Sequence, residues 1–146
     1  MGYNTLKTKI LTELTASDQS NHLIAMSFAV GLFVTLSPFW GAQNIIAISL
    51  AVLFRLNKVI VMITANLSSI PPLIPIIVLM AYQTGSVLMT GEFTDHIPEL
   101  DELRELKGHF ILYFVGAVVS GAFLSVLMFI VILVTLGMTR NKLSNQ

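Results

Sequence analysis

The sequence predicts an all-α integral membrane protein, and three observations lead to this prediction. Hydrophobic residues make up 55% of the 146 residues and charged residues only 11%, whereas a soluble domain normally carries about 25% charged residues. Two apolar stretches are each interrupted by a polar break that contains proline. A final apolar stretch, 110–137, carries no charged residue. We therefore interpret residues 1–146 as a single membrane domain.

The first segment, 1–20, is polar on average but carries a periodic apolar pattern. Leu6, Ile10 and Leu14 follow one another at intervals of four, and charged residues lie between them. This spacing places the apolar side chains on one face of a helix, so we predict an amphipathic helix that lies at the membrane interface. A solvated N-terminal helix is the alternative.

Residues 22–55 are predicted to form a broken helical hairpin. Apolar runs at 23–36 and 45–54 flank the break SPFWG at 37–41. At about 1.5 Å rise per residue, each run is roughly 20 Å long or less and falls short of the roughly 30 Å hydrocarbon core of a bilayer. The pair therefore indicates a re-entrant element that enters the membrane and returns to the same side.

Residues 59–91 repeat this pattern as a second broken helix. The break NLSSIPP at 66–72 separates a short apolar run from a longer one, and two adjacent prolines end a helix because they remove donors and crowd the preceding turn. The segment either crosses the membrane once as a discontinuous helix or re-enters as a second hairpin. Discontinuous helices of this kind form the binding sites of many transporters.

The last third of the chain is predicted to be an acidic polar loop followed by one long transmembrane helix. Six of the eight acidic residues lie in 92–109, and 110–138 is long enough to span a bilayer with some tilt. Ala117, Gly121 and Ser125 recur every four residues and form a small-residue stripe suited to close helix packing, either within the chain or across a dimer.

The basic residues predict how the chain is oriented, because they favour the cytoplasmic side of a membrane. We expect the N-terminus, the turn with Arg55 and Lys58, and the tail with Arg140 and Lys142 to be cytoplasmic. The acidic loop is then external, and the protein is a multi-pass protein of the bacterial inner membrane. If 59–91 re-enters instead of crossing, the C-terminal tail is external.

Polar side chains near the breaks are the candidate substrate-binding residues. A break at membrane depth leaves backbone groups without partners, and helix N-termini there attract anions. Arg55 is also a candidate, because a guanidinium can bind phosphate oxygens with two hydrogen bonds. Its alternative role is to set the orientation of the chain in the membrane. Serine and asparagine near proline often cap helix ends instead, so both roles stay open. The full set is Ser37, Gln43, Asn44, Arg55, Asn66, Ser68 and Ser69.

Catalytic, metal and cofactor motifs are absent from the sequence. There is no cysteine, and His22, His96 and His109 lack the spacing of a helical metal pair. No glycine-rich phosphate loop, serine nucleophile elbow or basic tract appears. We therefore expect a protein that is not an enzyme, has no cofactor and binds no nucleic acid.

The order of glycine, proline and polar positions in the chain resembles a bacterial membrane-domain family known as domain of unknown function 2062. The similarity begins with the run from Ala29 to Gln43, continues through 55–58 and 66–72, and ends with the sequence Tyr82–Ser86. It covers roughly residues 20–135. The resemblance implies a small inner-membrane protein. Some family members are fused to glycosyltransferase domains, which suggests work near lipid-linked sugars or their carriers.

Two functions are consistent with these features. The first is a small inner-membrane transporter, or a translocase for lipids or lipid carriers, with its site at the paired breaks and with membrane lipids as partners. We expect such a protein to form a homo-oligomer. The second is an accessory or scaffold subunit that does not transport and holds a glycosyltransferase or another envelope enzyme at the membrane. In that case the small-residue stripe and the acidic loop are contact surfaces.

Overall fold

The fold is described from a computed structural model, which defines residues 19–39, 41–93 and 106–144. Except for Gln19 and Ser20, the predicted amphipathic helix at 1–20 lies outside the described residues, and so does most of the predicted acidic loop at 92–109. Within the described ranges every regular element is a helix and none is a strand. The all-α prediction is therefore confirmed for this part of the chain.

The first two helices, α2 (Asn21–Leu36) and α3 (Gln43–Leu53), lie in the region predicted as a broken hairpin. The Ser20 side chain accepts a hydrogen bond from the Leu23 N–H and caps the start of α2. The helix ends before Ser37, whose backbone is extended, as expected for a residue that precedes proline.

The chain then reverses between α3 and α4 (Lys58–Ala65). Arg55 adopts a left-handed conformation with φ of 53°, and the Leu56 N–H donates to the Ala51 carbonyl at 2.8 Å. This closes the end of α3. The Asn57 side chain accepts hydrogen bonds from the N–H groups of Val59 and Ile60 and caps the start of α4.

The second broken helix consists of α4, the single 3-10 turn η1 (Leu67–Ser69) and α5 (Leu73–Thr90). Pro71 and Pro72 directly precede α5, and Pro75 lies in its first turn. Proline is tolerated in a first turn because the N–H groups there have no partner within the helix. Gly91 ends α5 in a left-handed conformation with φ of 78°.

The last helix, α6 (Leu106–Ser144), has 39 residues and is roughly 58 Å long at about 1.5 Å per residue. It begins at Leu106, so the last four residues of the predicted loop at 92–109 are helical instead.

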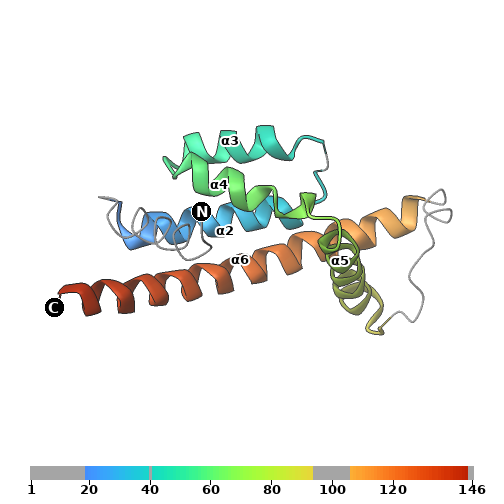
Figure 1. The fold of residues 1–146 in the computed structure, drawn as a ribbon. Coiled ribbons are helices and arrows are strands. Elements are labelled where there is room, and N and C mark those ends of the chain that lie inside the picture. Colours follow the sequence, from blue (N-terminus) through green and yellow to red (C-terminus); the bar gives the residue numbers. More distant parts are fainter. Residues whose placement is uncertain (1–18, 40, 94–105, 145–146) are drawn as a thin grey trace.

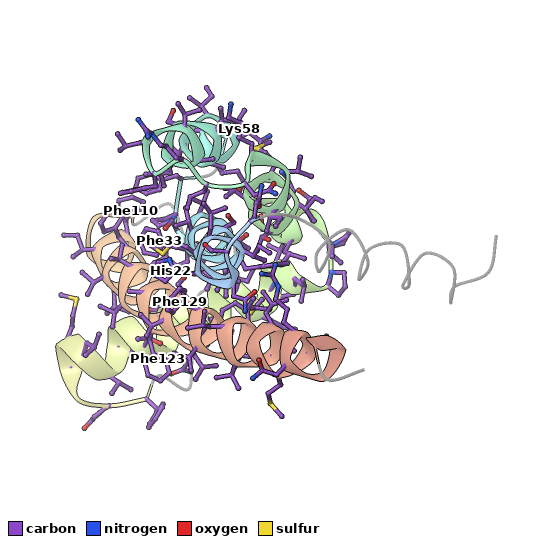
Figure 2. All side chains as sticks on the ribbon, turned by 90° about the vertical axis from the view of Figure 1, so that its left-hand side faces the viewer. His22, Phe33, Lys58, Phe110, Phe123 and Phe129 are labelled. Carbon is purple, nitrogen blue, oxygen red and sulfur yellow. The ribbon has the colours of Figure 1, made fainter. Side chains whose placement is uncertain are left out.

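Helix α2 occupies the centre of the molecule (Figure 1). It packs against α6 on one side and against α3 and α4 on the other, and α2 and α6 run in opposite directions. Helix α5 crosses α6 steeply near the N-terminal half of α6. Figure 2 views the bundle from the end that carries Lys58, where the rings of His22 and Phe129 meet edge to face at 5.2 Å.

The main core lies between α2, α3 and α4. Small side chains dominate it, which lets three helices approach closely. Its buried members are Val34, Ala47, Ala51, Leu56, Val61 and Ala65. A methyl group added at Gly31 would lie 2.6 Å from the Thr64 Cβ, so only glycine fits at this contact between α2 and α4.

Two helices are long and apolar enough to cross a membrane, as judged by length and composition within the described ranges: α5 over Leu73–Thr90 and α6 over Phe110–Asn141. The helices α2 and α3, and the α4–η1 segment, are apolar but shorter. Many large apolar side chains of α3, α5 and α6 are exposed.

Candidate functional site

The two proline-containing breaks lie next to each other at one end of the α2–α4 bundle (Figure 1). Here the C-terminal ends of α2 and α4 approach the N-terminal ends of α3 and α5. A cavity of about 330 Å³ opens between them. Its lining residues are Thr35, Gly41, Gln43, Asn44, Asn66, Ser68, Ser69, Ile74 and Ile77.

Five of the seven predicted binding residues line this cavity, and hydrogen bonds join four of them across the breaks. The Gln43 Nε2 atom lies 3.1 Å from the Ala65 carbonyl oxygen and 3.3 Å from the Ser68 Oγ. The Asn66 Nδ2 atom donates to the Asn44 Oδ1 at 3.1 Å. The first break is therefore tied to the second by side chains that the sequence places 22 to 25 residues apart.

The same side chains also terminate α4. Asn66 donates from Nδ2 to the Met62 carbonyl at 2.8 Å, and Gln43 donates to the Ala65 carbonyl. Thr35 adds a third bond from α2, because its Oγ1 lies 2.6 Å from the Thr64 carbonyl oxygen. These three side chains therefore cap the C-terminus of α4, where carbonyl groups would otherwise lack hydrogen-bond partners.

The N-termini of α3 and α5 differ from this end of α4. Neither Ala42 before α3 nor Pro72 before α5 provides a side-chain cap. Gly41, in the cavity wall, has φ of 88°, a backbone conformation that favours glycine. The cavity therefore contains amide and hydroxyl groups beside two helix starts that no side chain caps.

The other two predicted binding residues do not line the cavity. The buried Ser37 hydroxyl donates to the Phe33 carbonyl at 2.7 Å and completes the end of α2. Arg55 is exposed at the far end of α3, and the 11 residues of that helix separate it from the cavity by roughly 16 Å. The structure thus places Arg55 away from the cavity, because α3 runs away from the breaks.

Four lining residues were not among the predicted binding residues, and one of them, Gly41, belongs to the SPFWG break itself. Thr35, Ile74 and Ile77 lie within apolar runs, where no break or charge marks them. Ile77 is 8% exposed and Ile74 is 40% exposed, and both form the wall that α5 contributes. The proximity of Thr35 to the SPFWG break, and of Ile74 to Pro71 and Pro72 in the second break, was the available signal.

The small-residue stripe on α6 packs within the chain. Ala117 is fully buried, and Ser125 is buried as well. A methyl group added at Gly121 would lie 3.3 Å from the Leu36 Cβ of α2. Of the two packing modes that the sequence allowed, the stripe adopts the one within the chain.

Opposite the cavity, three basic residues lie at the other end of the bundle. Arg55 and Lys58 lie in the α3–α4 turn, and the Arg140 guanidinium donates to the Gln19 carbonyl at 2.9 Å. Asn57 also donates to the Gln19 side chain. This arrangement brings the start of α2, the α3–α4 turn and the end of α6 together.

The sequence as a whole matches one protein family, described as "Uncharacterized protein conserved in bacteria (DUF2062)", over residues 6–143. The chain belongs to this family. The match confirms the resemblance drawn from the glycine, proline and polar positions. No curated protein and no solved structure matches the chain.

Proposed function

We propose that this protein is a small transporter or lipid translocase of the bacterial inner membrane, and that the cavity at the paired breaks is its substrate site. The main support is the meeting of two polar breaks from separate apolar segments in one cavity. In lipid, an unpaired backbone group costs several kcal/mol. Irregular backbone is therefore tolerated at membrane depth where protein or trapped water covers it, as in transporter sites.

In the orientation that we propose, the end with Arg55, Lys58 and Arg140 faces the cytoplasm, because basic residues favour that side. Helices α2 and α3 then enter the membrane and return, α4 and α5 lead across it, and α6 returns to the cytoplasm. Helix α2 is roughly 24 Å long, so the cavity lies deep relative to that surface. Both termini are cytoplasmic in this arrangement.

This proposal assigns the protein no catalytic activity. Among the described residues no group of three or more potential metal ligands occurs, and the side chains that line the cavity are amides, hydroxyls and isoleucines. Proton coupling through a buried carboxylate has no candidate group in this cavity. A homo-oligomer in the membrane stays a prediction.

The alternative, an accessory subunit that does not transport, is less well supported. One of its two suggested contact surfaces was the stripe of Ala117, Gly121 and Ser125, which is buried within the same chain, with Gly121 against Leu36 of α2. The other, the acidic loop, lies mostly outside the described residues.

Reconstitution into liposomes with lipids labelled on one acyl chain tests the proposal. A membrane-impermeant reductant added outside bleaches the labels that reach the outer leaflet, and the bleached fraction measures translocation. We expect the purified protein to accelerate translocation over protein-free liposomes. Asn44→Ala should slow it about five-fold, because one polar contact in the cavity is lost.

Ser49→Ala is the matched control. Ser49 is an exposed residue of the same helix, and its hydroxyl donates to the Ile45 carbonyl, away from the cavity. We expect wild-type rates for Ser49→Ala and for Arg55→Ala. Equal rates in liposomes with and without the protein, for labelled lipids and for encapsulated neutral solutes, would contradict transport and favour the accessory role.

A further inference from the structure

The chemistry of the cavity narrows the class of substrate, and this inference rests on the proposed function of the cavity. Its seven polar or glycine positions carry amide, hydroxyl or backbone groups, and no described residue that lines it is charged. Arg55 and Lys58 lie beyond the far end of α3, and Arg140 lies near Gln19 at that same end.

An anionic group would therefore enter the cavity without a cation from these side chains to balance it. Transferring an ionised group from water without a partner is costly. The start of α5 offers little compensation, because Pro72 and Pro75 have no N–H and the Leu73 N–H already donates to the Ile70 carbonyl. The start of α3 has no side-chain cap either, but a helix N-terminus carries only about half an elementary charge, which leaves most of the charge of a phosphate unbalanced. The cavity thus disfavours a phosphate as the group that it surrounds.

A hydroxyl-rich neutral group fits these surroundings better. A hydroxyl both donates and accepts a hydrogen bond, and so do the amides of Gln43 and Asn44 and the hydroxyl of Ser69. Ile74 and Ile77 supply one apolar wall, which suits the C–H face of a sugar ring or the start of an acyl chain.

The size of the cavity is also informative. Its volume of about 330 Å³ lies at the lower end of the range for small-molecule sites, roughly 300–1,000 Å³. That space holds a headgroup and leaves long hydrocarbon chains outside, against the exposed apolar side chains of the neighbouring helices.

We propose that the cavity binds an uncharged, polyhydroxylated headgroup, such as a sugar or polyol. The same chemistry occurs in a free sugar and in the headgroup of a glycolipid. The experiment therefore contains one arm for each source.

The only tryptophan of the chain, Trp40, directly precedes Gly41 in the sequence, and Gly41 lines the cavity. Tryptophan fluorescence is therefore a single-site reporter of binding. The full chain is reconstituted in phosphatidylcholine nanodiscs, since maltoside and glucoside detergents carry the very headgroup under test. Three probes are titrated separately: glucose, short-chain glucosyl-diacylglycerol and short-chain phosphatidic acid.

We expect saturable fluorescence changes with glucosyl-diacylglycerol, and at least ten-fold weaker binding of phosphatidic acid. Saturation with glucose at similar concentrations would identify the free sugar as sufficient, and its absence would identify the lipid-linked form. Ser69→Ala and Asn44→Ala should each weaken glucosyl-diacylglycerol binding about five-fold, whereas Ser49→Ala should bind like the wild type.

Phosphatidic acid binding as tightly as the glycolipid would overturn the inference, and so would no saturable change with either sugar-bearing probe. Translocation in liposomes is measured independently. If the protein translocates lipids but prefers phosphatidic acid to the glycolipid, the proposed headgroup class is refuted and the transport function is retained. Glycolipid binding without translocation would support the headgroup class and refute the transport function.

Discussion

Helix α6 crosses two other helices, α5 and α2, and the two crossings differ in how closely the helix backbones approach each other. At the crossing with α5, Gly116 and Gly85 lie so near the facing backbone that an added Cβ would overlap the carbonyl oxygen of Ala81 or Leu112, respectively. At the crossing with α2, an added Cβ at Gly121 would meet a side-chain atom of Leu36 at 3.3 Å. The first crossing joins backbone to backbone, and the second joins side chains.

This difference has a structural consequence for the cavity. Helix α5 contributes the apolar wall through Ile74 and Ile77, and its main contacts are with α6. Ile77 lies eight residues from Gly85, which is roughly 12 Å along the helix. The α5–α6 crossing therefore positions one wall of the cavity, while the α2–α6 crossing supports the bundle that carries the polar side.

The largest effect is expected at the α5–α6 crossing. Gly116→Ala places a methyl group against the Ala81 carbonyl, and a backbone atom in a packed helix has little freedom to move away. We expect a loss of about 3 kcal/mol of unfolding free energy, measured by circular dichroism during titration from a mild detergent into dodecyl sulfate.

Gly137→Ala is the control on the same helix, because nothing lies within 4 Å of its added Cβ. There the better helix propensity of alanine should stabilise by up to about 1 kcal/mol. Equal stability of the two variants would show that α5 does not cross α6 at Gly116.

The sequence allows a cavity residue to be predicted only where a local pattern distinguishes that residue from its neighbours. Prolines and polar residues interrupt apolar runs, so Gln43, Asn44 and Asn66 were recognisable as residues near the breaks. Their joint position in one cavity follows from the hairpin topology, which brings the two breaks to the same end. Their role in binding stays a prediction.

The distance of Arg55 from the cavity has a physical cause. In the linear sequence Arg55 follows the same apolar run that begins near the first break, but a helix of 11 residues carries the chain to the opposite end. Arg55 and the first break therefore flank the same apolar run in the sequence but lie at opposite ends of α3 in the structure. Arg55 instead occupies a left-handed turn position, which no sequence pattern indicated.

The α5–α6 crossing was missed for a different reason. The predicted stripe on α6 was chosen by four-residue spacing on one helix alone, whereas a backbone contact needs small residues on both partners. Ala81 and Gly85 on α5 also lie four apart and face Gly116. Pairing small residues between two segments would have been the better signal.

The α2–α6 crossing can be tested by cross-linking, because the chain contains no native cysteine. An added Cβ at position 121 lies 3.3 Å from the Leu36 Cβ, close to the roughly 3.5–4.5 Å found across disulfides. Leu36→Cys combined with Gly121→Cys should therefore oxidise within one chain. The loss of both thiol hydrogens is detected by mass spectrometry, and oxidation should stabilise the fold by about 2 kcal/mol.

The control pair is Leu36→Cys with Gly137→Cys, since position 137 is 16 residues farther along α6 and roughly 24 Å away from position 121. It should remain reduced under the same conditions. A covalent dimer as the main product of the Leu36/Gly121 pair would mean that the stripe packs between two chains instead.

The smallest effect is expected for Gly121→Ala. The neighbouring Leu36 side chain has to yield by only a few tenths of an ångström, and the gain in helix propensity offsets this cost. We expect the unfolding free energy to change by less than about 0.5 kcal/mol in the same dodecyl sulfate titration. Gly121→Leu should cost about 2 kcal/mol, because the larger side chain overfills the contact with Leu36.

Adding Leu36→Ala to Gly121→Leu separates side-chain crowding from other causes. If the two residues meet as described, the double variant recovers stability relative to Gly121→Leu, and the coupling between the two substitutions exceeds about 0.5 kcal/mol. Additive effects would mean that Leu36 does not pack on Gly121. A recovery at this crossing is expected because a side chain can be shortened, whereas no side-chain truncation can make room for a methyl group against the Ala81 carbonyl.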